Sequence, residues 1–524
     1  MTRRRRRAGA HLTTQFATVR GTVPERKENQ MKRLTRPALW VPLLSAVPVV
    51  SLLALGTAPA QATLTARATP RFIAIDLGTL GGPNAAPNDP GHSITESGIV
   101  VGSAETTALD PFPNDPGCLS SPCHAGHAFQ WRDGHMTDLG SLHGYQSGLF
   151  ELNGAGVGAG VSETGRLDPL TGIPETHAVI SENGRLVDLG TLGGHQSWAN
   201  SINDRGQVAG WAANKTRDRW AQFFSPYPSA TQVRATLWQG GTLRNLGTLG
   251  GPDSVGGFVN QRGQVAGESF TNATENPATG VPTMDPFLWQ HGVMKDLGTL
   301  GGTFGFTNWI NSHGEVAGLS DLSGDQTFHP FLWNGHRLVD LGTLGGDNGV
   351  ANWVSDSGMV AGAADVPGSQ AHHGFLWKNG TMRDLPPTGT ARCSIAWVVN
   401  TGGQAVGADT DCQGSNLAAV LWEHGAAYDL NTLIGRFPVH LAEAFYISNR
   451  GEIACLGTLP NGDLRVVLLV PAGLAARQGL SGTPATSQAP AQQRAAARSV
   501  PDPRDNPTSL LGQLAATIRP RLHP

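Results

Sequence analysis

Short apolar stretches separated by turn residues recur along most of the chain. Stretches such as PFLW at Pro286–Trp289 and TNWIN at Thr307–Asn311 are rich in Val, Ile, Phe and Trp and are bounded by Gly, Asn and Asp. This pattern is typical of strands joined by tight turns. In a turn such as INDRG at Ile202–Gly206, the Asn side chain can cap the backbone and the Gly can take a positive φ. The chain is therefore predicted to be all-β.

The strand stretches belong to a unit that is repeated eight times. Each copy contains an FLW-type strand, a strand that ends in DLG, an IN-type strand and a VAG-type strand. The DLG position recurs every 44 to 62 residues and is occupied by Asp76, Asp138, Asp188, Asn245, Asp296, Asp340, Asp384 and Asp429. Four antiparallel strands per repeat predict a β-propeller of eight four-stranded blades. Seven blades is the alternative if one copy is degenerate.

The two ends of the repeat region predict how the ring closes. The first copy begins at FIAIDLG (Phe72–Gly78) and lacks an FLW-type strand, whereas an unpaired VVLLV (Val466–Val470) follows the last copy. Pairing of these N- and C-terminal strands would complete one blade and leave no free sheet edge.

The recurring DLGTLGG motif is interpreted as a structural turn, because no helical pattern follows any copy, as a phosphate loop would need. A side-chain cap on the turn's backbone amides explains both Asp and Asn245 at its first position. We expect the motif to join the second and third strands of a blade, and longer links to run from the fourth strand to the next blade at the same end. These links are Ser103–Gly126, Val161–Thr176, Ala212–Arg234 and Glu268–Asp285.

Two columns of the repeat are expected to be core positions. The FLW-type strand supplies Trp131, Trp238, Trp289, Trp333, Trp377 and Trp422, and large aromatic residues in one column fit packing between blades. The final Gly of VAG becomes Cys455 in the last copy, and a lone Cys in a column of small residues is most simply a core residue.

These motifs resemble those of a known family. HAFQW at His127–Trp131 and HAVI at His177–Ile180, with the FLW, DLGTLGG and VAG stretches, are similar to the HAF-type extracellular repeats of bacterial proteins. The resemblance covers Phe72 to Val470. It implies an exported repeat protein and supplies no catalytic residues. Two copies, at Asp384–Thr390 and Asp429–Gly435, depart from the consensus, so their loops are expected to differ.

The N-terminal residues 1–62 have the organisation of an export leader. Basic residues follow Met31, an apolar stretch comes next, and Ala60-Gln61-Ala62 forms a cleavage site, so Met31 is interpreted as the real start. Alternatively, the uncleaved apolar stretch anchors the chain in a membrane. Residues 63–473 would form the propeller, and residues 474–524, rich in Ala, Pro, Gln and Arg, a disordered tail. These features predict a secreted, extracellular protein.

The charge of the chain limits its partners. Most of the basic surplus lies in the leader, and the residues beyond Ala62 contain 26 Lys and Arg against 38 Asp and Glu. An acidic body argues against nucleic acid and anionic membranes as partners, since both favour basic surfaces. We expect a monomer that binds an extracellular glycan or protein.

The cysteines fit an exported protein with two local disulfides. Cys118 and Cys123 lie close together, and Cys393 and Cys412 flank one repeat. A zinc site at Cys118, Cys123, His124 and His127 is the alternative, but the spacing is unlike common zinc patterns. No cofactor is expected, although a ring of Asp side chains from the DLG motifs could hold Ca²⁺.

Long loops on a regular scaffold are the expected place for binding. The link Ala212–Arg234, with the residue before it, offers a candidate platform for a sugar or peptide: Trp211, Arg217, Trp220, Phe223, Phe224 and Tyr227. The alternative is that these aromatic residues form a local core. A second hypothesis is a polysaccharide hydrolase or lyase that uses loop carboxylates such as Asp168, Glu175, Asp285 or Asp325, although no recognised catalytic motif is present.

Overall fold

The computed structural model describes residues 69–88, 91–112, 115–224, 229–277, 279–412 and 417–478, so the expected leader and the tail beyond Gln478 lie outside these residues. Besides strands, the described part contains two short 3-10 helices, η1 (Ala221–Phe224) and η2 (Leu430–Thr432), and one α-helix, α1 (Ala472–Gln478). The first residues of the expected disordered tail are therefore helical. None of the helices among these residues has the length and apolar character needed to cross a membrane.

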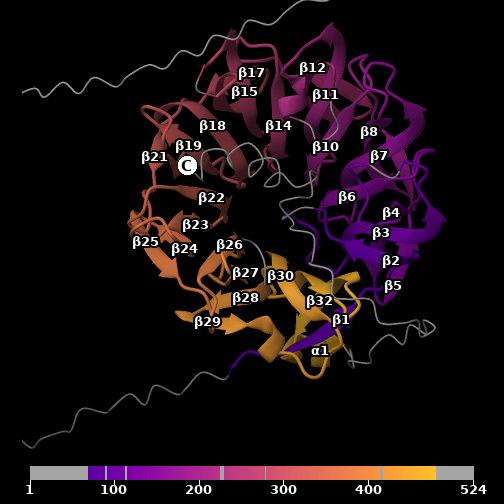
Figure 1. The fold of residues 1–524 in the computed structure, drawn as a ribbon, viewed down its shortest axis with the longest axis vertical. Helices are drawn as coiled ribbons and strands as arrows, with labels where there is room; N and C mark the ends of the chain where they lie inside the picture. Colours follow the sequence, from indigo (N-terminus) through magenta and orange to yellow (C-terminus); the bar gives the residue numbers. More distant parts are fainter. Residues whose placement is uncertain are drawn as a thin grey trace, which may run out of the picture. The chain divides into compact units, whose positions relative to one another are not determined.

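The strands form antiparallel units of four that surround a common axis (Figure 1). In every unit but the first, where the corresponding turn at Thr95 follows β2 after extra residues, the strand nearest the axis carries the IN-type stretch. These inner strands are β2 (Gly81–Ala86), β6 (Ser147–Leu152), β10 (Ser197–Ile202), β14 (Ser254–Val259), β18 (Gly301–Ile310), β22 (Gly349–Val354), β26 (Cys393–Val399) and β30 (His440–Ile447). The second strand carries the VAG-type stretch. These strands are β3 (Val100–Leu109), β7 (Gly158–Leu167), β11 (Val208–Arg217), β15 (Val265–Glu275), β19 (Val316–Leu322), β23 (Val360–Asp365), β27 (Ala405–Thr410) and β31 (Ile453–Thr458).

The FLW-type strand is third in each unit and the DLG-type strand is outermost. The third strands are β4 (His124–Arg132), β8 (Pro174–Glu182), β12 (Thr231–Gln239), β16 (Pro282–Gln290), β20 (Phe328–Trp333), β24 (His372–Lys378), β28 (Ala418–Glu423) and β32 (Leu464–Pro471). The outermost strands are β5 (His135–Asp138), β9 (Arg185–Asp188), β13 (Thr242–Asn245), β17 (Val293–Asp296), β21 (Leu338–Asp340), β25 (Thr381–Leu385), β29 (Ala426–Asp429) and β1 (Phe72–Asp76).

The predicted all-β propeller of four-stranded blades is confirmed. Six units are separate four-stranded sheets, and an eight-stranded sheet contains two more. In that sheet, a single parallel pair between Met284 of β16 and Phe304 of β18 links two antiparallel units. Counted in this way, the described residues contain eight four-stranded units.

The predicted closure by the terminal strands is also observed. β1 pairs antiparallel with β32, from Phe72 opposite Pro471 to Asp76 opposite Val467. The backbone amide of Leu464, at the start of β32, also donates to the side-chain oxygen of Asn84 in β2, at 2.8 Å. The end of the repeat region is thus bonded both to its first strand and to the next unit.

The position of DLGTLGG within the sheets differs from our interpretation. The motif joins the outermost strand of one unit to the inner strand of the next, as between β13 and β14, and the long links are hairpins between the second and third strands, as between β11 and β12. The length of the repeat is the same whichever of the four strands is taken as the first, so the repeat length cannot show where a sheet begins. The two kinds of connection do lie at one end, because the amide of Gly251 donates to the carbonyl of Phe270 at 2.9 Å.

Hydrogen bonds explain the DLG and HAF motifs. The Asp138 carboxylate accepts from the amide of Gly140 at 2.7 Å, and Asn245 does the same for Gly247 at 2.9 Å, which is the predicted cap. The same Asp also pairs with the His that opens the HAF motif on the neighbouring strand. Four such pairs are present: His127–Asp138, His177–Asp188, His329–Asp340 and His373–Asp384.

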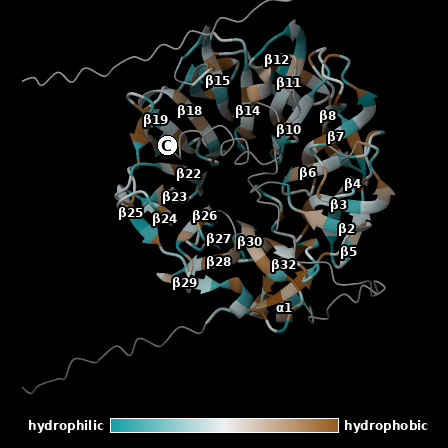
Figure 2. Cartoon of the chain, viewed as in Figure 1, coloured by the Kyte–Doolittle hydropathy of each residue, from teal (hydrophilic) through white to brown (hydrophobic). Residues whose placement is uncertain are grey.

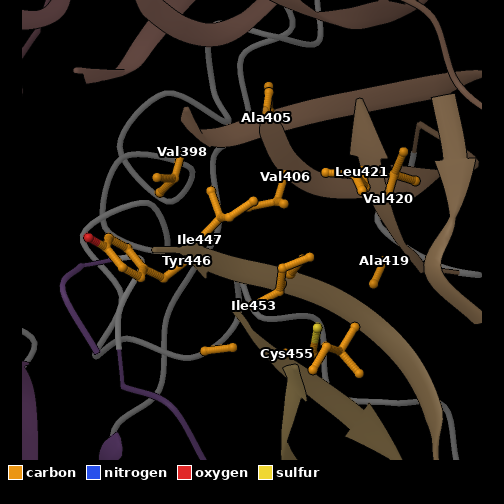
Figure 3. Close-up of a cluster of buried hydrophobic side chains, with 14 of the residues drawn as sticks. Val398, Ala405, Val406, Ala419, Val420, Leu421, Tyr446, Ile447, Ile453 and Cys455 are labelled. Carbon is orange, nitrogen blue, oxygen red and sulfur yellow. The ribbon is translucent and has the colours of Figure 1, made fainter. Parts of the chain in front are cut away.

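The core lies within and between the blades. Hydrophobic residues are concentrated in the strands, and hydrophilic ones in many of the connections (Figure 2). The tryptophan column is buried except for Trp377, which is half-buried. In the VAG column, a Cβ on Gly318 would lie 2.0 Å from the Phe306 carbonyl oxygen, so this position requires glycine. Cys455 is unpaired and fully buried among aliphatic side chains, as expected of a core residue (Figure 3).

Candidate functional site

A cavity of about 350 Å³ lies at the propeller axis. It is lined by the ends of the inner strands and by the short turns that follow them, such as those at Asn153, Asn260 and Asn400. These are the uniform turns between the first and second strands, so the cavity is at the end of the sheets opposite to the long hairpins. Cavities that hold small ligands usually measure about 300–1,000 Å³.

One position of the inner strand gives the cavity two different walls. We call it the axial position: the residue two places before the capping Asn, Ser or Thr of the turn. In most units this residue pairs with the Ala of VAG, as Trp309 does with Ala317. Around the ring the axial residues are Ser93, Glu151, Ser201, Phe258, Trp309, Trp353, Val398 and Tyr446. One side of the ring is therefore small or acidic, and the other is mostly aromatic.

The aromatic wall is continuous. The rings of Trp309 and Trp353 are stacked with their centroids 3.7 Å apart, and Phe258 lies 4.9 Å from Trp309. The Tyr446 ring meets Trp353 edge to face at 5.9 Å. Figure 3 shows the Tyr446 hydroxyl pointing away from the aliphatic core of the last two units.

His92 reaches this wall from the first unit. Its imidazole Nδ1 lies 3.2 Å from Glu151 Oε1 of the second unit. Its ring also makes edge-to-face contacts with Trp309, Trp353 and Tyr446, with centroids 4.9, 5.3 and 5.1 Å away. One side chain thus joins residues that are remote in the sequence.

Extra residues in the first unit place His92 at the axis. Asn84 and Gln146 are equivalent, because their backbone amides donate to Glu105 and Glu163 in their own units. Thr95 follows Asn84 by eleven positions, whereas the equivalent Asn153 follows Gln146 by only seven. The additional residues lengthen the path between β2 and the turn.

The cavity has acidic character. Glu151 is only 4% exposed, and its Oε2 has no hydrogen-bond partner. Burial raises the pKa of Tyr446 far above its usual value, and the nearby charges of Glu96, Glu151 and Asp356 raise it further. No Lys or Arg occurs among the described residues that line the cavity. Arg450, at its rim, donates to the Glu96 carbonyl and lies 3.6 Å from Glu452.

Bonds between neighbouring turns hold the cavity wall. Asn260 caps its own turn through Oδ1, which accepts from the amides of Arg262 and Gln264, both at 3.0 Å. Its Nδ2 donates across the blade boundary to the carbonyl of Asn311, also at 3.0 Å. Asn153, Asn203, Asn311 and Asn400 make the same bond to the next unit. The turn role of this column was predicted, but its inter-blade bond was not.

The aromatic platform expected on Ala212–Arg234 is largely a local core. Trp211 and Phe224 are 2% and 6% exposed, and Trp220 and Phe223 are half-buried against the same cluster. Phe224 packs on Phe270 with ring centroids 4.8 Å apart. The short helix η1 folds these side chains inward, and Trp211 and Phe224 join one cluster of buried hydrophobic residues.

The polar part of that platform has local roles. Arg217 is exposed. The neighbouring Arg219 lies over the Trp220 ring at 4.3 Å and bonds Glu275 at 2.8 Å. Tyr227 lies outside the described residues.

The carboxylates suggested for an enzyme are spread over three blades: Asp168 and Glu175 share one, and Asp285 and Asp325 each lie in another. Asp168 accepts from the amide of Leu170, and Glu175 accepts from Arg166, Thr164 and His195. Asp325 accepts from the amide of Thr303. Burial, and then the neighbouring Asp296, raise the pKa of Asp285 to about 6. Each group therefore has a local structural partner.

The long-loop end also holds the two cysteine pairs and a group of acids. Cys118 is bonded to Cys123, and Cys393 to Cys412, as the sequence suggested. Near the first pair, Asp110, Asp115 and Glu163 are buried, with oxygen atoms within 4.8 Å of one another. Burial, and then the facing Asp115, raise the pKa of Glu163 to about 9, so this carboxyl group keeps its proton near neutral pH.

The residues of the cavity were missed at the sequence level. His92, Glu151, Trp309, Trp353 and Tyr446 lie in stretches that we recognised only as strands and turns. Two signals pointed to them: the change of residue type along the axial position, and the extra residues before Thr95.

Comparisons with known proteins do not identify the chain. No family model matches it, and no curated protein does. Among solved structures, it is similar to dipeptidyl peptidase 4 of Porphyromonas gingivalis (11% identity, TM-score 0.41, 78% of this chain and 62% of that one). It is also similar to TolB of Acinetobacter baumannii (11%, 0.30, 61% and 64%) and to the Trypanosoma rangeli sialidase (10%, 0.30, 72% and 60%). The alignments thus span less than two thirds of each of these structures.

Proposed function

We propose that this chain is an exported binding protein that holds its ligand in the axial cavity. The observation that carries the proposal is Glu151, a buried carboxylate whose Oε2 has no hydrogen-bond partner and which lines a cavity of about 350 Å³. Buried polar atoms are nearly always paired, so an unpaired one in a cavity suggests a ligand group. Side chains that differ between the copies converge at this point, as a specific site requires.

Three features support an extracellular location. They are the leader-like residues 1–62, the resemblance to HAF-type extracellular repeats, and the two disulfides. The ligand class expected from the sequence is a glycan or a protein. We place its bound group at the axis, and no longer on the long-loop end where the sequence suggested it.

A blocked cavity tests this proposal. Val398 occupies the axial position that holds Trp309 and Trp353 in other units, so Val398→Trp is designed to fill the cavity. Because Val398 is buried and faces Val406 where those Trp residues face Ala, circular dichroism and thermal unfolding would first establish that the variant is folded. Leu170→Trp, at an exposed site on the long-loop end, is the matched control. The oxidised protein would be applied to a glycan array and to a small-molecule thermal-shift panel. We expect Val398→Trp to remove the binding that the control keeps.

Two outcomes would contradict the proposal. Binding lost only in Leu170→Trp would place the site on the long-loop end. Turnover of a polysaccharide that Glu151→Gln abolishes would identify an enzyme instead.

A further inference from the structure

The acids around the cavity differ in how far they are already satisfied. At the rim, Asp204 accepts from the amide of Gly154 at 2.6 Å, and Asp356 from Ser312 at 2.9 Å. Glu96 accepts from the amide of Asn449 at 3.0 Å. Glu151 lies deeper, with His92 on Oε1 and no partner on Oε2. The three rim acids are exposed to water, so Glu151 is the buried one of the four, and its second oxygen has no hydrogen-bond partner.

The aromatic wall complements this carboxylate. Trp309, Trp353 and Tyr446 all line the cavity and surround the His92 ring, which is bonded to Glu151. The face of an aromatic ring is electronegative, and it attracts cations by about 0.5–2 kcal/mol per contact. Burying a carboxylate is costly unless its oxygens are hydrogen-bonded, and only Oε1 of Glu151 is, through His92. The two walls thus favour the same kind of guest.

Anionic guests are disfavoured by the same groups. The lining described above contains four carboxylates and no Lys or Arg side chain. An anion would meet like charges in a partly enclosed space, which raises its free energy.

We infer that the axial cavity binds an organic ammonium group, with Glu151 as its counter-ion and Trp309, Trp353 and Tyr446 as its aromatic wall. This inference rests on the proposed function and names the chemistry of its ligand. The volume fits a small cation or the charged end of a larger molecule.

Choline and 3,3-dimethylbutan-1-ol test this inference, because they share a shape and differ in charge. Binding to the oxidised protein would be measured by calorimetry and by ligand-observed NMR. We expect choline to bind at least about tenfold more tightly than the neutral alcohol, and Glu151→Gln to weaken choline by at least about tenfold. Glu182→Gln is the control, because it removes the same charge at an exposed site outside the cavity. Deacetylated and acetylated chito-oligosaccharides show whether an amine on a glycan also binds.

The outcomes separate this inference from the proposed function. If the alcohol binds as tightly as choline, or if Glu151→Gln leaves choline binding unchanged, the ammonium inference is wrong, while an axial site for neutral ligands would stand. If neither compound binds, and no ligand of the array or panel depends on Val398, both the inference and the proposed function fail. Choline binding that survives Val398→Trp would place the ammonium site elsewhere.

Discussion

Buried aromatic residues lie at both ends of the propeller, but they face different surroundings. At the long-loop end, Trp211, Phe224 and Phe270 are covered by the chain itself. At the opposite end, Trp309, Trp353 and Tyr446 are also buried, but the surface that they keep faces the axial cavity. The difference follows from the connections, because a long hairpin can fold over its own aromatic side chains and a short turn cannot.

This contrast corrects a common inference. Long and variable loops are often where binding occurs, and on that basis we placed the ligand at the long-loop end. Here the hairpin that carries the candidate platform, Ala212–Arg234, packs into a satellite core with the neighbouring hairpin. The units differ most at one position of otherwise uniform strands, where eight equivalent sites carry very different side chains, and this is why we propose the axial cavity as the binding site.

The largest expected effect tests the role of the long-loop aromatics. Phe224→Ala should lower the free energy of unfolding by about 3–5 kcal/mol, because it leaves a cavity against Phe270. Ligand binding at the axis should be unchanged. Urea denaturation and calorimetry with choline would measure both quantities. A Phe224→Ala variant that is as stable as the wild type but no longer binds choline would instead indicate that the ligand binds at the loop platform.

A smaller effect is expected where the cavity wall is held together. Asn260→Ala removes a turn cap and leaves the buried Asn311 carbonyl without its side-chain donor, so it should cost about 2–3 kcal/mol. Asn260→Ser keeps a capping oxygen, as Ser355 does in its own turn, and should cost only about 1 kcal/mol. Both variants lose the bond to Asn311, so an Asn260→Ser variant as stable as the wild type would mean that the bond between blades contributes nothing to stability.

Local chemistry explains why the fold was predictable from the sequence. Turn caps such as Asn203 and Asp138 bond to amides only a few residues away. The first copy lacks an FLW-type strand before Phe72, and this predicted that Val466–Val470 would pair there. The first strand of each sheet was not predictable. The sequence has the same order, a DLG-type strand, the turn and an IN-type strand, whether these two strands belong to one blade or to neighbouring blades. That choice depends on which strands pair in three dimensions.

The cavity depends on contacts that no local pattern encodes. His92 touches Trp309, Trp353 and Tyr446, which belong to three other units. Their proximity exists only after the ring has closed. The same reasoning applies to Phe224, whose burial depends on η1 folding over Phe270, since its hydrophobic character alone fits either a core or a platform.

The acids of the long-loop end provide a test that depends on pH. The pKa of Glu163 is raised from 4.5 to about 9 in the folded state, mainly by burial. Its protonated form therefore adds stability that is complete below about pH 4.5 and is lost as the pH rises towards 9. Burial also raises the pKa of the neighbouring Asp110, which acts in the same direction.

Glu163→Gln should remove most of this dependence. The variant resembles the protonated side chain, since its oxygen can still accept from the amides of Tyr145 and Gln146. We expect it to match the wild type near pH 5 and to be more stable at pH 9 by at least about 1.4 kcal/mol, the equivalent of one pKa unit. Glu175→Gln is the matched comparison: burial is outweighed by bonds from His195, Arg166 and Thr164, which lower the pKa of Glu175, so the change should destabilise the protein at both pH values. Urea denaturation from pH 5 to pH 9 measures these differences. A Glu163→Gln variant that is less stable than the wild type at pH 9 would show that the ionised carboxylate is stabilised at this end of the propeller, as a bound cation would do.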